Sequence, residues 1–65
     1  MSLSFDIYRA GYERGIQEGM AGLRRLARWE LLIRSPITWL PAVDVDSYVR
    51  GYLDGYWFGL SQRHI

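Results

Sequence analysis

The chain has 65 residues, a net charge of +1, no cysteine and 49% hydrophobic residues. This length allows one domain at most, which we place over residues 1–65, and the composition excludes a disordered chain. The missing cysteines exclude a disulfide framework and thiolate chemistry, and the small charge excludes non-specific nucleic-acid binding by the whole molecule. Because so short a chain cannot enclose this much apolar surface, we expect a homodimer or docking on a larger partner. We expect no secretory signal and no membrane span, and the missing cysteines suit a cytoplasmic protein.

The strongest pattern in the sequence is a motif that occurs twice, at an offset of forty residues. Residues 6–19 and 46–59 both follow D-x-Y-x-x-G-Y-x-x-G-x-x-x-G. Glycine at every fourth position lies along one side of an α-helix, although each interior glycine costs about 1 kcal/mol relative to alanine. Close approach of another helix offsets such a cost, so we predict helix packing at the shared positions. These are Tyr8, Gly11, Tyr12, Gly15, Gly19, Tyr48, Gly51, Tyr52, Gly55 and Gly59.

The first predicted element is a long helix over residues 5–34. Apolar and small residues recur there at alternating spacings of three and four, from Phe5 to Ile33, with Trp29 on the same seam. Ser4 or Asp6 is the expected N-terminal cap. The many glycines leave open whether this helix is continuous or bent near Gly19–Gly22.

The second predicted element is a proline-containing loop over residues 35–44. Pro36 ends the first helix because proline lacks the N–H group and disfavours helical geometry at the residue before it. Ile37, Trp39 and Leu40 are too apolar for a free loop, so we expect the segment to fold back over the helices. Trp39 is either part of the core or an anchor for a partner.

The third predicted element is a helix over residues 45–62, capped by Asp44, Asp46 or Ser47. We therefore predict an all-α helical hairpin with a glycine- and tyrosine-rich seam. In an antiparallel hairpin, however, the second helix would leave Tyr8 and Tyr12 without an intramolecular partner. Either the first helix bends, which gives three short helices, or a second molecule covers its amino half, and we favour the homodimer.

The sequence offers little for catalysis. His64 is the only histidine, and neither a zinc or calcium ligand pattern nor a phosphate-binding loop occurs. We therefore predict that the protein is not an enzyme and has no cofactor and no metal.

Arginine supplies all eight positive side chains, by genomic base composition or by selection for phosphate and carboxylate binding. On the predicted helix, Arg24, Arg25 and Arg28 span about a third of the circumference, and Arg34 lies farther along. This face is either simply solvated or binds phosphates or an acidic protein. The tyrosine stripes either build a core or leave rings exposed for stacking, with Tyr56 and Trp57 the favoured exposed members.

Three stretches resemble the family of the bacterial ribosome modulation factor. They are A-G-Y-x-x-G-I at residues 10–16, the turn at Ser35-Pro36, and Y-x-x-G-Y-x-x-G at residues 48–55. The resemblance implies a small helical protein that docks on the small ribosomal subunit and silences translation.

Three functional hypotheses stay open. The first is a regulator of a ribonucleoprotein machine, most specifically a ribosome-hibernation-like factor whose four arginines contact phosphate. The second is a phage or mobile-element inhibitor of a host protein complex, such as an anti-CRISPR protein. The third is a purely structural dimerising module.

Overall fold

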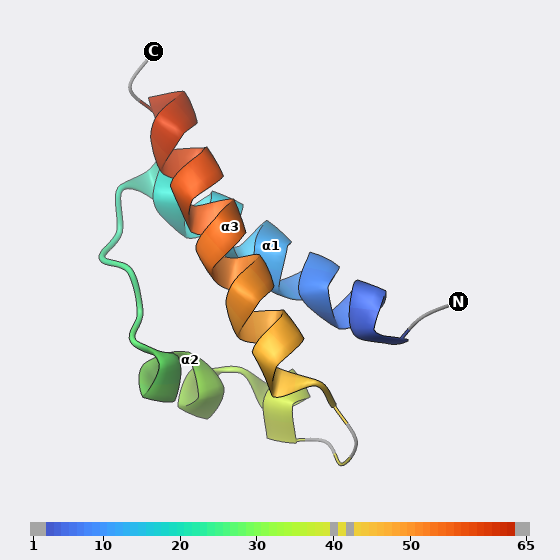
Figure 1. Ribbon diagram of the computed structural model, residues 1–65. Helices are drawn as coiled ribbons and strands as arrows, with labels where there is room; N and C mark the ends of the chain where they lie inside the picture. The colour runs from blue at the N-terminus through green and yellow to red at the C-terminus, as the bar shows by residue number, and fades with distance from the viewer. Residues whose placement is uncertain (1–2, 40, 42, 64–65) are drawn as a thin grey trace.

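The computed structural model describes residues 3–39, 41 and 43–63, and all regular structure in them is helical. The elements are α1 (Leu3–Ala21), α2 (Arg28–Arg34), the 3₁₀-helix η1 (Pro36–Trp39) and α3 (Val45–Arg63). Figure 1 shows α3 lying across α1, with α2 and η1 to one side of this pair. The all-α prediction is confirmed.

The two long helices, α1 and α3, pack directly on each other and run in the same direction. Gly11 faces the backbone of Tyr48, and eight residues later Gly19 faces the backbone of Tyr56. The contact positions advance together along both helices, so the two copies of the repeat lie in register. The pairing of two long helices through one connection agrees with the predicted hairpin, whereas the antiparallel order is wrong.

Glycine permits this contact because the two backbones touch. A Cβ atom on Gly15 would lie 2.6 Å from the backbone nitrogen of Tyr56 and 3.0 Å from the carbonyl carbon of Gly55. No side chain fits at such distances in a close-packed interface. All six glycines of the repeat are buried: Gly11, Gly15, Gly19, Gly51, Gly55 and Gly59.

The parallel arrangement gives the amino half of α1 a partner within the same chain. The Tyr8 hydroxyl donates a hydrogen bond to Asp54 over 2.6 Å, and the ring centroid of Tyr12 lies 6.3 Å from that of Phe58. The reason for expecting a second molecule over this half is therefore gone. The homodimer stays a prediction.

The first helix ends at Ala21, far short of the predicted residue 34, because a Schellman motif closes it. Gly22 has a φ of 74°, in the left-handed region that favours glycine. Its N–H group donates to the Gly19 carbonyl (3.2 Å), and that of Leu23 donates to the Glu18 carbonyl (3.0 Å). These two bonds are the pair that defines the motif. The helix therefore ends within Gly19–Gly22, the segment where a bend was expected.

Tyrosine hydroxyls of α3 hold the chain that follows α1. The Leu26 N–H group donates to the Tyr52 hydroxyl (2.9 Å), which itself donates to the Glu18 carboxylate (2.7 Å). The Tyr56 hydroxyl donates to the Leu23 carbonyl (2.8 Å). These bonds satisfy backbone groups that have left the helix, which explains why the positions carry tyrosine and not phenylalanine.

A buried serine fixes the far end of α2. Ser35 is 1% exposed, and its hydroxyl accepts a hydrogen bond from Arg14 of α1 over 2.6 Å. The Thr38 hydroxyl donates to the carbonyl groups of Leu32 (2.9 Å) and Ser35 (2.8 Å), which ties η1 to α2. The connection is thus attached to the helix pair by polar contacts at defined points.

Helix caps differ partly from the predicted ones. Asp6 lies in the first turn of α1, which already begins at Leu3. Asp44 caps α3, accepting from the Ser47 N–H group (3.2 Å) and from its hydroxyl (2.8 Å). At α2, the Glu30 carboxylate accepts from the Ala27 N–H group (3.1 Å), as in one half of a capping box.

The core is small. The molecule measures 39 × 26 × 13 Å, which leaves few positions that can be fully enclosed. The buried apolar side chains of the described residues are Ile7, Leu26, Leu31, Tyr48, Tyr52 and Tyr56.

Leu40 and His64, and the side chains of Ser4, Phe5 and Ile37, lie outside the described part. Within the described part, no helix is long and apolar enough to cross a membrane.

Candidate binding surface

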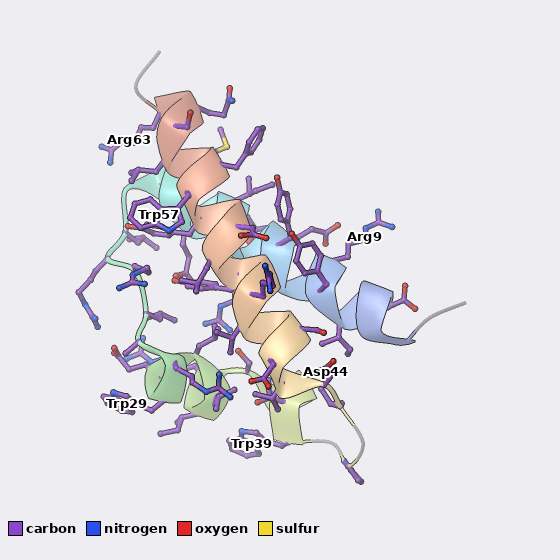
Figure 2. The ribbon with its side chains drawn as sticks, in the orientation of Figure 1. Arg9, Trp29, Trp39, Asp44, Trp57 and Arg63 are labelled. Carbon is purple, nitrogen blue, oxygen red and sulfur yellow. The ribbon has the colours of Figure 1, made fainter. Side chains whose placement is uncertain are left out.

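Three large apolar side chains of the connection are strongly exposed, and we call them together the tryptophan face: Trp29, Ile33 and Trp39. Trp29 is 65% exposed and Trp39 is 70% exposed. Trp29 and Ile33 are four residues apart on α2 and so share one side of it. The Trp39 indole donates to the Leu32 carbonyl over 2.8 Å, which holds its ring against α2. Figure 2 shows Trp29 and Trp39 along the same edge of the molecule.

The break in the first helix explains this exposure. A continuous helix over residues 5–34 would have placed Trp29 and Ile33 on its packing seam, and that expectation is wrong. Once the chain leaves the helix at Gly22, α2 turns a different side towards α3, with Leu31 as its buried residue. Trp39, for which core and anchor were both open, is not in the core.

The aromatic residues of α3 behave differently from one another. Tyr56 is only 8% exposed, so it offers no stacking surface, and its predicted membership of an exposed platform is wrong. Trp57 is 55% exposed and packs edge-to-face on Tyr56, with ring centroids 5.5 Å apart. Phe58 beside it is also exposed. The exposed aromatic surface of α3 is therefore Trp57 and Phe58.

The four candidate arginines do not share one helix face. Arg24 and Arg25 lie in the irregular chain after α1, and Arg28 and Arg34 are the first and last residues of α2. All four are exposed. The predicted common face required a helix through residues 22–27, which the Schellman motif ends.

Carboxylates neutralise two of these arginines. Arg24 forms a bidentate contact with Glu30, with distances of 3.1 and 2.7 Å. Arg28 contacts Asp46 over 2.6 Å, and both side chains of this pair are largely solvated. The Arg24 guanidinium, followed by the Ala27 N–H group, lowers the pKa of Glu30 to about 2. Glu30 therefore stays ionised, and Arg24 is partly occupied at neutral pH.

A groove lies beside the Arg28–Asp46 pair, between the start of α2 and α3. Its volume is about 580 Å³, and its lining combines charged side chains with apolar ones. Two arginines and two aspartates compensate each other there, so the groove has no strong preference for either sign of charge. The lining residues are Arg28, Asp46, Ser47, Val49, Arg50, Leu53 and Asp54.

Arg14 is a candidate binding residue that the sequence pattern does not single out. Its side chain is 27% exposed, and its guanidinium bonds to Glu18 (3.1 Å) and Ser35 (2.6 Å). On α1 it lies between two glycines of the repeat, and nothing in the sequence indicates that Ser35 returns to it. Only the tertiary structure reveals this contact.

No group of three or more metal-ligating side chains gathers within the described residues. Every buried side-chain nitrogen or oxygen there has a hydrogen-bond partner. Comparison of the chain with protein-family models, with curated proteins and with solved structures finds no match.

Proposed function

We propose that the protein is a non-enzymatic regulator that docks on a larger ribonucleoprotein in the cytoplasm, most specifically on the ribosome. The observation that carries this proposal is the exposure of Trp29 and Trp39 beside Arg28. Stacking of a base on an aromatic side chain contributes about 1–3 kcal/mol, and arginine contacts phosphate without regard to sequence. The tryptophan face and the arginines of the connection together provide both kinds of contact. The glycine- and tyrosine-rich seam between α1 and α3 is then the scaffold that presents them.

Co-sedimentation with ribosomal particles tests this proposal. The purified protein should sediment with 30S or 70S particles at low salt, and a Trp29→Ala/Trp39→Ala variant should lose this. Trp57→Ala removes an exposed tryptophan from α3 and serves as the matched variant that should still bind. An Arg24→Ala/Arg25→Ala/Arg28→Ala variant should bind more weakly, and its affinity should depend less on salt concentration. Failure of the unmodified protein to sediment at low salt would end the ribosomal proposal.

One observation favours a second function, inhibition of a host protein complex by a phage or mobile-element protein such as an anti-CRISPR protein. Arg24 and Arg28 already hold carboxylates, which reduces the positive charge available for RNA. Exposed tryptophan is among the residue types that dominate protein–protein binding energy. Pull-down from a bacterial lysate separates the two functions: ribosomal proteins support the first, and one stoichiometric host complex supports the second.

We further propose that the protein forms a homodimer. Trp57 and Phe58 of α3 remain exposed after the intramolecular packing is complete, and Figure 2 shows Trp57 away from Trp29 and Trp39. A second copy covering them would bury the apolar surface that the small core leaves outside. Light scattering on the purified protein tests this, and a monodisperse monomer at all concentrations would contradict it.

A further inference from the structure

Three arginines from separate parts of the chain meet around one small cavity. Its volume is about 250 Å³, and it lies between α1, the chain after it and the end of α2. This volume is several times the roughly 30 Å³ that one water molecule occupies in the liquid. The lining residues are Arg14, Glu18, Leu23, Arg24, Leu26 and Arg34.

The cavity carries an excess of positive charge. Glu18 offsets Arg14 (3.1 Å), and Glu30, which does not line the cavity, offsets Arg24 (2.7 Å). No carboxylate among the described residues forms an ion pair with Arg34. Counting these five side chains, three positive and two negative charges leave one positive charge, which a single anion would balance.

Arg14 is held in place before any ligand arrives. Its Nε atom donates to Glu18, and its Nη1 atom donates to the hydroxyl of buried Ser35 (2.6 Å). These contacts use part of a guanidinium that has five N–H donors. A partly buried charge is less screened by solvent than an exposed one, and here Leu26 adds an apolar wall.

The arrangement fits a phosphate group better than a carboxylate. The three guanidinium groups come from three different segments, whereas a planar carboxylate needs only one arginine for a bidentate contact. A tetrahedral phosphate presents oxygens in several directions, and arginine's planar fork matches those oxygens.

We propose that this cavity binds one phosphate group through Arg14, Arg24 and Arg34, with Arg24 shared between the ligand and Glu30. The phosphate comes either from free inorganic phosphate or from an RNA backbone. The RNA form rests on the proposed function and assigns it a specific phosphate contact, to which Arg14 contributes.

Titration of the full chain with inorganic phosphate at constant ionic strength, followed by the guanidinium Nε–Hε signals in NMR, tests the site. The signals of Arg14, Arg24 and Arg34 should shift together. Arg34→Ala should weaken phosphate binding by roughly tenfold, which corresponds to 1.4 kcal/mol. Arg9→Ala is the matched control, because Arg9 is exposed on α1 and pairs with Glu13 away from the cavity, and it should leave the affinity unchanged. Glu30→Gln, which frees Arg24, should strengthen binding.

Unchanged guanidinium signals, or equal weakening by Arg34→Ala and Arg9→Ala, would overturn the proposal. None of the side chains replaced in these variants takes part in the Arg14–Ser35 contact. Repeating the titration with a short single-stranded RNA identifies the source: tighter binding than that of inorganic phosphate, again weakened by Arg34→Ala, assigns RNA, and equal affinity assigns free phosphate. Phosphate binding without ribosome co-sedimentation would support the phosphate site and contradict the ribosomal function. Co-sedimentation without phosphate binding would support the ribosomal function and contradict the phosphate site.

Discussion

The α1–α3 pair and the chain that connects its two helices are held in place by different kinds of contact. In the pair, glycines bring two backbones into contact along matched positions of the repeat. In the connection, single polar contacts such as Arg14–Ser35 and Leu26–Tyr52 fix the chain at a few points, and large apolar side chains face solvent. The comparison shows that the helix pair leaves no room for an added side-chain atom at its glycines, whereas the connection leaves large apolar side chains exposed, which is the surface that we propose binds a partner.

The largest effect expected from this comparison is that of Gly15→Ala. Alanine raises helix propensity by about 1 kcal/mol, but its methyl group meets the backbone of α3. Overpacking of this kind costs about 1–3 kcal/mol or more, and here the opposing atoms are backbone that cannot move aside. We expect a net loss of stability in urea unfolding followed by circular dichroism. Gln17→Ala, at an exposed position of the same helix, is the control, and stabilisation by Gly15→Ala would contradict close packing.

Tyr52→Phe should have the next largest effect, since it removes the link between the pair and the connection. The buried hydroxyl accepts from Leu26 and donates to Glu18, so its loss leaves the Leu26 N–H group without this partner, while Glu18 keeps its contact with Arg14. An unsatisfied buried group costs about 1–3 kcal/mol. Tyr12→Phe is the comparison, because the Tyr12 hydroxyl forms no hydrogen bond within the described residues. Equal unfolding midpoints for the two variants would show that the Tyr52 contacts contribute nothing.

The same residue predicts an alkaline instability. Burial, above all, raises the pKa of Tyr52 from 10.0 to about 12, since the hydroxyl is enclosed and bonded to a carboxylate. The unfolded chain therefore loses this proton at a lower pH than the folded chain does. The stabilising difference is complete below pH 10 and declines as the pH rises from 10 to about 12. Tyrosinate absorbance measured during unfolding checks this, and Tyr52→Phe should remove one late-titrating group.

The smallest effect on stability belongs to the tryptophan face. Trp29→Ala/Trp39→Ala should leave the unfolding free energy within about 0.5 kcal/mol per site, as for most surface substitutions. It should still abolish the binding tested by co-sedimentation. A large loss of stability would mean that these rings support the fold, and the separation of scaffold from binding surface would then fail.

The break of the first helix was partly readable from the sequence. Gly22 followed by apolar Leu23 is the sequence signal of a Schellman motif, whereas the seam from Phe5 to Ile33 predicts a helix that continues through it. The wrong prediction of a continuous helix also affected the placement of the arginines. Arg24, Arg25 and Arg28 were assigned to one helix face that does not exist.

The direction of the helices could not be read from periodicity. Glycine at every fourth residue looks the same in either direction along a helix. The connection decides it: α1 is roughly 28 Å long at 1.5 Å per residue, and the chain from residue 22 to residue 44 is long enough to return along it. A helix reaching residue 34 would have left a short loop and favoured an antiparallel pair. The hydrogen-bond partners of Arg14 and Tyr52 depend on this return path, so the periodicity of the sequence could not predict them either.

The register of the two repeats is most directly tested by nuclear Overhauser effects between glycine Hα protons in isotope-labelled protein. Isotope filtering against a mixture of labelled and unlabelled chains assigns each effect to one molecule. The parallel register predicts intramolecular contacts from Gly15 to Gly55 and from Gly19 to Gly59. Contacts from Gly11 to Gly59 and from Gly19 to Gly51 would show an antiparallel pair and contradict the account.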